Sequence, residues 1–158
     1  MNDALTYAIN LMIETNPSEL ETAAIELHNF NVVINQKRAT VAQLTAPEVQ
    51  KIFAAKCKNV SHLIMELHEH KQLRLLPKIQ SAFHRLLENN GLKVVELSCA
   101  HPEEQIENVK NQLGKNTIVI SKTDPKLLAG VKITSSTGTS EFSFDLLLKR
   151  VKEAIVQA

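Results

Sequence analysis

Histidine and carboxylate side chains gather in one short stretch, residues 62–70, and they are the first candidates for chemistry. His62 and Glu66 are four residues apart, so on a helix they share a face and could bind one metal ion together. His68 and His70 point about 200° apart on a helix, so both cannot join that pair. A small metal-dependent enzyme centred on His62 and Glu66 is therefore one hypothesis, and a solvated helix face is the other.

The remaining reactive groups form no recognisable catalytic set. Cys57 and Cys99 are far apart, without CxxC spacing or a glycine-rich elbow, so we expect reduced thiols with a structural role. Glu103 and Glu104 are adjacent and do not face one another on a helix, and a helix start explains them because anions are favourable there. No catalytic residue, metal or cofactor is predicted.

Composition excludes several classes of protein. Eighteen basic and seventeen acidic residues give a net charge of +1, unlike the basic stripe of a nucleic-acid-binding surface. Aromatic residues are 4% and glycines number four, which disfavours a base-stacking sheet and both common phosphate-binding loops. The chain contains no uncharged apolar run of about 18 residues. We expect a soluble protein, or one peripheral to a membrane.

Residues 1–90 have helical periodicity, because their apolar side chains recur three or four positions apart. The expected helices run from about residue 4 to 13, from Pro17 to about Val33, from Ala46 to Cys57, through Val60 to Leu67, and from Leu76 to Asn90. Five or six short helices with brief connections are typical of an antiparallel bundle. This bundle is the first predicted domain.

Polar residues mark three of the helix starts. Asn16 precedes a proline and is the expected N-cap of the second helix. Thr45 and Glu48 have capping-box spacing. Asn59 or Ser61 is expected to cap the helix that follows.

Apolar spacing also predicts which faces are buried. For the first helix the expected buried residues are Leu5, Ala8, Ile9, Met12 and Ile13. For the helix after Thr45 they are Val49, Ile52, Phe53 and Cys57.

Residues 91–158 change to a mixed pattern, β-α-β-β-β-α, and form the second predicted domain. The expected strands are residues 92–99, 116–121, 130–135 and 139–143, with one helix from Pro102 to Gly114 carrying Ile106, Val109 and Leu113, and a final helix from about Phe144 carrying Leu147, Leu148, Val151 and Ile155. The chain is therefore predicted to be α+β. So small a second unit should gain stability by docking against something.

A turn and a glycine precede the third expected strand. The Asp124 side chain can bond the backbone two residues on, and Gly130 allows a positive φ or a close backbone contact. Both roles are structural.

This stretch resembles the end of a known family, the delta subunit of rotary ATP synthases and its mitochondrial counterpart, the oligomycin-sensitivity-conferring protein (OSCP). The matching residues are Asp124, Pro125, Leu127, Leu128, Ala129, Gly130 and Val131, then Glu141, Ser143, Leu147 and Val151. QLRLLPKIQSAF and VVELSCAHPEEQIENVKNQL look like earlier family segments. The resemblance covers essentially the whole chain and is strongest from Leu73 onward.

The resemblance implies a non-catalytic stator of a rotary proton-translocating ATP synthase. Residues 1–90 would bind the N-terminal helix of a head alpha subunit, and residues 91–158 would contact the membrane-anchored b subunits, on the cytoplasmic face of a bacterial plasma membrane or the matrix side in a mitochondrion. The implied contacts to the alpha subunit are Tyr7, Ala8, Leu11, Leu76, Ile79 and Phe83. The implied structural motif is Asp124, Leu128, Gly130, Glu141 and Ser143. Neither nucleic acid nor direct membrane insertion is implied, and an unrelated helical adaptor stays an alternative.

Overall fold

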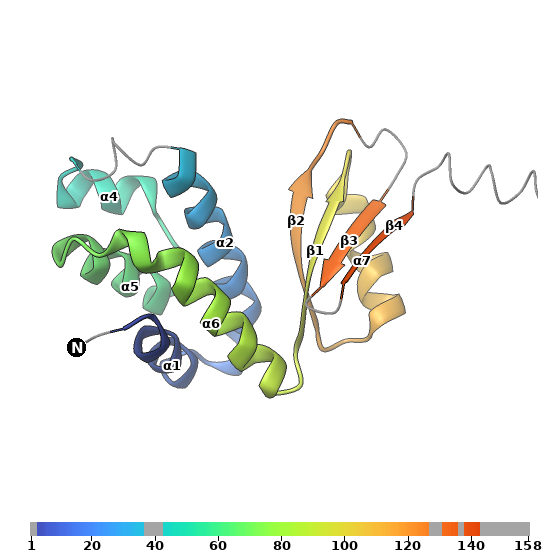
Figure 1. The fold of residues 1–158 in the computed structure, drawn as a ribbon, viewed down its shortest axis with the longest axis horizontal. Helices are drawn as coiled ribbons and strands as arrows, with labels where there is room; N and C mark the ends of the chain where they lie inside the picture. The colour runs from blue at the N-terminus through green and yellow to red at the C-terminus, as the bar shows by residue number, and fades with distance from the viewer. Residues whose placement is uncertain (1–2, 37–42, 127–130, 136–137, 143–158) are drawn as a thin grey trace, which may run out of the picture. The chain divides into compact units, whose positions relative to one another are not determined.

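A computed structural model describes residues 3–36, 43–126, 131–135 and 138–142 (Figure 1). The chain divides into two compact units, Met1–Gly91 (unit 1) and Leu92–Ala158 (unit 2). Unit 1 is helical and unit 2 contains a sheet, so the predicted α+β class is confirmed. The predicted final helix from Phe144 lies outside the described residues, as do Leu128, Gly130 and Ser143.

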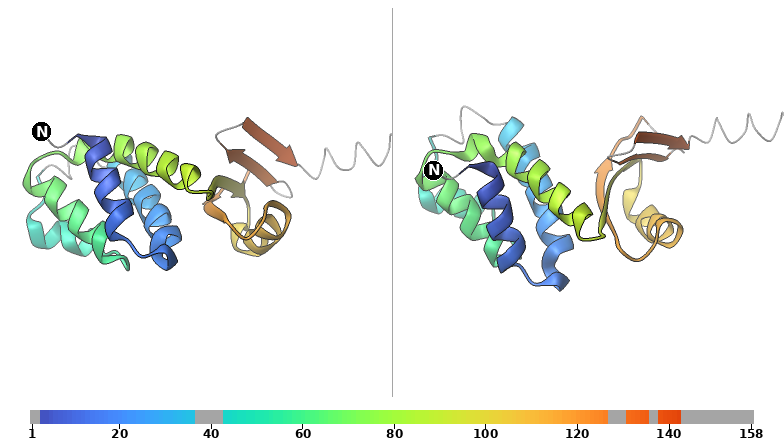
Figure 2. Two further views of the ribbon diagram at one scale, coloured as in Figure 1. Left: turned by 90° about the horizontal axis from the view of Figure 1, so that it is seen from below. Right: turned by 60° about the horizontal axis from the view of Figure 1, so that its bottom comes forward.

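Unit 1 packs its helices around one apolar interior. Its described helices are α1 (Ala4–Glu14), α2 (Leu20–Gln36), α4 (Ala46–Ile52), α5 (Lys58–Glu69) and α6 (Leu76–Asn89), with short 3-10 turns η1 (Pro17–Glu19) and η2 (Leu73–Leu75). Helix α6 contacts both α1 and α2, and the two views of Figure 2 show it running alongside them. Its stripe of Leu76, Ile79, Phe83 and Leu87 is fully buried.

One of the predicted helix starts is confirmed in part and another is wrong. Asn16 is an N-cap with Pro17 in the first turn, as predicted, but it makes no side-chain capping bond and the element that it begins is the short η1, so α2 starts only at Leu20. Helix α5 begins at Lys58 with Cys57 as its N-cap, so Asn59 and Ser61 lie inside it. The Asn59 side chain instead contacts α1, where its Nδ2 donates to the Glu14 carbonyl at 2.9 Å.

Helix α4 starts as predicted and ends earlier than predicted. The Thr45 N–H donates to Glu48 Oε2 at 3.0 Å, which is one arm of the capping box. The helix stops at Ile52 rather than Cys57, because Phe53 leaves the helical conformation and its ring packs edge-on against Phe30, with centroids 5.1 Å apart. Ile52 is consequently 43% exposed and not buried as expected.

The buried face of α1 also differs from the prediction. Tyr7, Ala8 and Leu11 are buried, whereas three of the expected core residues are at the surface. These are Leu5, Ile9 and Ile13.

Unit 2 is a four-stranded sheet with strand order β2-β1-β3-β4. Its elements are β1 (Lys93–Cys99), α7 (Pro102–Leu113), β2 (Thr117–Thr123), β3 (Val131–Ser135) and β4 (Gly138–Phe142). Strand β1 pairs in parallel with β2 and antiparallel with β3. The parallel pair needs a crossover connection, and α7 supplies it.

One face of this sheet forms a hydrophobic cluster in which the helix takes part. Val95, Leu97, Cys99 and Val119 pack with Val109 of α7. Leu113, predicted to join them, is 36% exposed at the end of the helix.

Tight backbone turns end α6 and α7. Gly91 has φ 83° and Gly114 has φ 109°, in the region that a side chain disfavours. The predicted turn after β2 is confirmed, because the Lys126 N–H donates to Asp124 Oδ1 at 3.1 Å. None of the helices within the described residues combines the length and the hydropathy that a membrane-spanning helix needs.

Candidate docking surface

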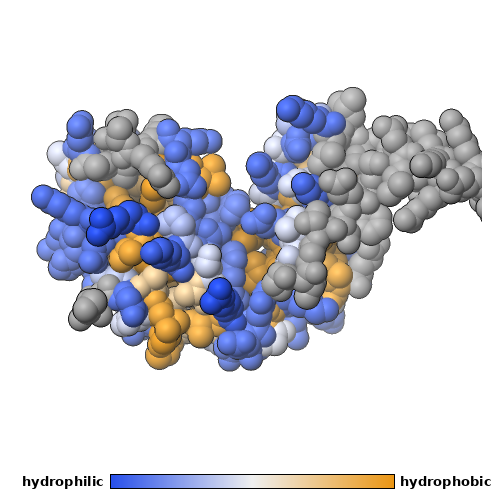
Figure 3. All heavy atoms as spheres, in the orientation of Figure 1, coloured by the Kyte–Doolittle hydropathy of each residue, from blue (hydrophilic) through white to orange (hydrophobic). Residues whose placement is uncertain are grey.

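An exposed apolar row lies on α1. The side chains of Leu5, Ile9 and Ile13 are 53%, 38% and 76% exposed, and their four-residue spacing places them on one side of the helix. Figure 3 shows hydrophobic atoms reaching the surface of unit 1 in the region of α1. Large apolar side chains so aligned favour a protein contact.

Hydrogen bonds fix both ends of α1. At its start, Asp3 Oδ1 accepts from the Thr6 N–H at 2.8 Å and from Thr6 Oγ1 at 2.9 Å. These bonds lower the pKa of Asp3, the backbone bond first, because they favour the ionised carboxylate. At its end, Asn59 Nδ2 of α5 donates to the Glu14 carbonyl. Helix α1 is therefore held in place while its outer face stays exposed.

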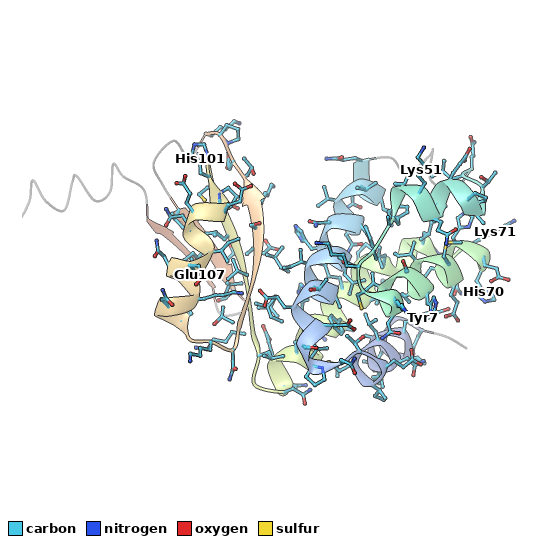
Figure 4. All side chains as sticks on the ribbon, turned by 180° about the vertical axis from the view of Figure 1, so that it is seen from behind. Tyr7, Lys51, His70, Lys71, His101 and Glu107 are labelled. Carbon is cyan, nitrogen blue, oxygen red and sulfur yellow. The ribbon has the colours of Figure 1, made fainter. Side chains whose placement is uncertain are left out.

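The six predicted partner contacts all lie beneath this face. Tyr7, Ala8, Leu11, Leu76, Ile79 and Phe83 are each no more than 5% exposed. Figure 4 shows Tyr7 among the helices of unit 1, and its hydroxyl donates to Gln72 Oε1 at 3.1 Å. The structure brings the six together as core between α1 and α6, whereas the exposed row beside them was predicted to be buried.

The exposure of this row has a signal in the sequence. Helix α1 has apolar side chains on nearly all sides, and one helix can bury only part of such a surface. After Ala4, α1 has seven apolar residues, and the three that are buried, Tyr7, Ala8 and Leu11, are the ones that face neighbouring helices.

A cavity of about 100 Å³ lies between α1 and α5. It is lined by Tyr7, Asn10, Leu11, Glu14, Asn59, His62, Leu63 and Glu66. His62 and Glu66 thus share a cavity, as their spacing predicted. Across the described residues, no group of three or more His, Cys, Asp or Glu side chains could hold a metal ion.

The other histidines of this stretch are used elsewhere. His68 Nε2 lies 2.8 Å from the Leu44 carbonyl, within hydrogen-bonding distance. His70 ends α5, and Figure 4 shows it with Lys71 at the periphery of unit 1. The cluster in the sequence is therefore dispersed in the structure.

Neither cysteine is placed as a nucleophile. Cys57 and Cys99 are both free and buried. Burial raises the pKa of the Cys99 thiol, the Glu104 carboxylate raises it further, and the His101 backbone N–H opposes them. A buried thiol that stays protonated is inert at neutral pH.

A family model described as "ATP synthase delta (OSCP) subunit" matches residues 6–155. The chain belongs to this family. A member of the ATP synthase delta (OSCP) family is a subunit of ATP synthase, placed in its peripheral stalk with a structural rather than a catalytic role, and it associates with other ATP synthase subunits.

Two further comparisons add little to that assignment. No curated protein matches the chain. A chain of the "Cryo-EM structure of Toxoplasma gondii mitochondrial ATP synthase hexamer, composite model" is 14% identical to this chain, with a TM-score of 0.43, and 99% of this chain and 98% of that chain are covered.

Proposed function

We propose that the chain is the stator subunit that links the catalytic head of a rotary, proton-translocating ATP synthase to its membrane-anchored b subunits. The family match over residues 6–155 carries this proposal. Such a subunit makes and breaks no bonds in substrate. It resists the torque that would otherwise turn the head with the rotor.

Unit 1 is the part that binds the head in this proposal. Its partner is the N-terminal helix of an alpha subunit, laid along the exposed row of α1. Leu5, Ile9 and Ile13 suit such a helix, because helix-in-groove contacts use apolar anchors one turn apart. The alpha helix would bury side chains that unit 1 leaves in water.

The six buried residues support this surface from below. Tyr7, Ala8 and Leu11 face inward from the same helix, and Leu76, Ile79 and Phe83 lie on α6, which contacts α1. Replacing any of them would change binding through the position of α1.

Unit 2 is the part that holds the ends of the b subunits in this proposal. In the described part of unit 2, α7 packs into the hydrophobic cluster on one face of the sheet. A unit of this size gains stability from a docked partner. The chain would reach the membrane only through the b subunits, on the cytoplasmic face of a bacterial plasma membrane or the matrix side in a mitochondrion.

The experiment is a binding measurement with the isolated catalytic head and with a synthetic peptide of the alpha-subunit N-terminus. Wild-type chain binds both, and Ile9→Asp weakens binding at least about 10-fold because it places a charge at the centre of an apolar contact. Ile52→Asp is the matched control, since Ile52 is similarly exposed on α4. Wild-type protein that binds neither head nor peptide would rule the proposal out.

A further inference from the structure

The exposed face of α1 consists of two parallel rows. Leu5, Ile9 and Ile13 form the apolar row. Thr6, Asn10 and Glu14 are each one residue later, so they form a second row about 100° further round the helix. Every member of both rows is exposed. A helix laid on the apolar row therefore has one flank over the polar row.

The polar row leads into the cavity between α1 and α5. Asn10 and Glu14 line it from α1, and Asn59, His62 and Glu66 line it from α5. Glu14 and Glu66 have exposed side chains, and α1 contains no Lys or Arg. This side of the surface carries carboxylates from two helices.

We infer that the surface selects an amphipathic helix with Lys or Arg along one flank of its apolar face, and that Glu14 and Glu66 recognise that flank. The inference rests on the proposed function and adds the charge that the docked alpha-subunit helix must carry. The apolar row supplies most of the affinity, because burial of apolar surface drives association. The Glu14 and Glu66 carboxylates determine the orientation of the docked helix and which helices can bind.

The charge of this surface also determines which kind of helix can bind to it. A second copy of the chain docking through the same face would bring no Lys or Arg of its own α1 to these carboxylates, because α1 contains neither. A helix with an acidic flank would be rejected, because like charges across an interface are unfavourable. A cationic flank is complementary.

The test is a fluorescence titration of the full chain with a labelled synthetic peptide of the alpha-subunit N-terminus from the same organism. The double variant Glu14→Gln/Glu66→Gln is compared with wild type at low and high salt. We expect its Kd to rise by about 2- to 10-fold at low salt, because exposed charge pairs contribute modestly. The difference should shrink at high salt, which screens the carboxylates.

Two controls make the result specific. Glu103→Gln/Glu107→Gln removes the same charge from exposed positions of α7 in unit 2 and should leave the Kd unchanged. Glu14→Lys/Glu66→Lys should bind the native peptide more weakly than the Gln double variant does. It should bind a peptide whose Lys and Arg are replaced by Glu more tightly than wild type does.

The outcomes separate this inference from the proposed function. Equal Kd values for wild type and the Gln double variant, with no salt dependence, would overturn the role of Glu14 and Glu66 while leaving the docking of the alpha-subunit helix intact. No binding of peptide or head by wild type would overturn both.

Discussion

The Tyr7 hydroxyl donates a hydrogen bond of 3.1 Å to Gln72 Oε1, which joins α1 to a residue 65 positions further along the chain. The phenol ring is buried at the same time. One side chain thus serves as core and as a polar tie that fixes where α1 lies, and the exposed row depends on that placement.

Tyr7→Phe removes the tie and keeps the ring. We expect the free energy of unfolding to fall by about 0.5 to 1.5 kcal/mol, the usual contribution of one hydrogen bond. Urea unfolding followed by far-UV circular dichroism measures it. Ser81→Ala, which removes an exposed hydroxyl from α6, should change stability by no more than about 0.5 kcal/mol. Equal effects of the two variants would contradict the role of the Tyr7–Gln72 bond.

Glu26→Gln should destabilise the junction between α2 and α5. The Glu26 carboxylate accepts from the Lys56 N–H at 2.8 Å and from the Cys57 N–H at 3.4 Å, so it satisfies backbone donors where α5 begins. We expect a loss of about 1 to 2 kcal/mol in unfolding free energy, because bonds to a charged acceptor are the stronger ones. Glu69→Gln, exposed at the end of α5, is the control and should have little effect.

Asp3→Ala should lower the melting temperature at neutral pH, whereas Asp3→Asn keeps an N-cap and should lower it less. The pKa of Asp3 is lowered in the folded state, so its stabilisation is present above the unfolded pKa of about 3.9 and is lost as pH falls through the folded value. Melting curves across the acid range should therefore show wild type and Asp3→Ala converging. A constant difference would contradict this.

Cys99 should make unit 2 sensitive to alkali. Burial raises the pKa of the Cys99 thiol, so the folded state favours its protonated form. The contribution of this thiol to the free energy of unfolding is therefore complete below the pKa of the unfolded chain, about 8.5, and is lost as pH rises through the folded-state pKa. We expect the stability difference between wild type and Cys99→Ala to narrow as pH rises, since the variant lacks this titration. Iodoacetamide should also modify native Cys99 far more slowly than the thiol of the unfolded chain.

Helices with one narrow apolar stripe were predicted well from the sequence. In α6, the spacing of Leu76, Ile79 and Phe83 allows only one face of the helix to be buried. Gly91, which has a positive φ, ends this helix. The turn at Asp124 was predicted for the same kind of reason, because its hydrogen bond is local. Features that depend only on residues close in the sequence can be predicted without knowing the distant residues that pack against them.

The face of α1 and the end of α4 could not be predicted, because each depends on a distant partner. The choice between Leu11 and Ile13 as core is made by α5 and α6, which come much later in the chain. Helix α4 stops where Phe53 meets Phe30 of α2. The partner contacts predicted on α1 therefore fall on side chains that the structure buries.

The place of β1 in its sheet has a mechanical consequence. The chain that leaves Gly91 enters β1 at Lys93, and β1 is hydrogen-bonded to β2 along its length and to β3 over its second half. Tension pulled along the backbone from unit 1 would load two ladders in shear at once, whereas an edge strand could be peeled away one bond at a time. An entry strand in the middle of its sheet would suit the stator role that we propose for this chain.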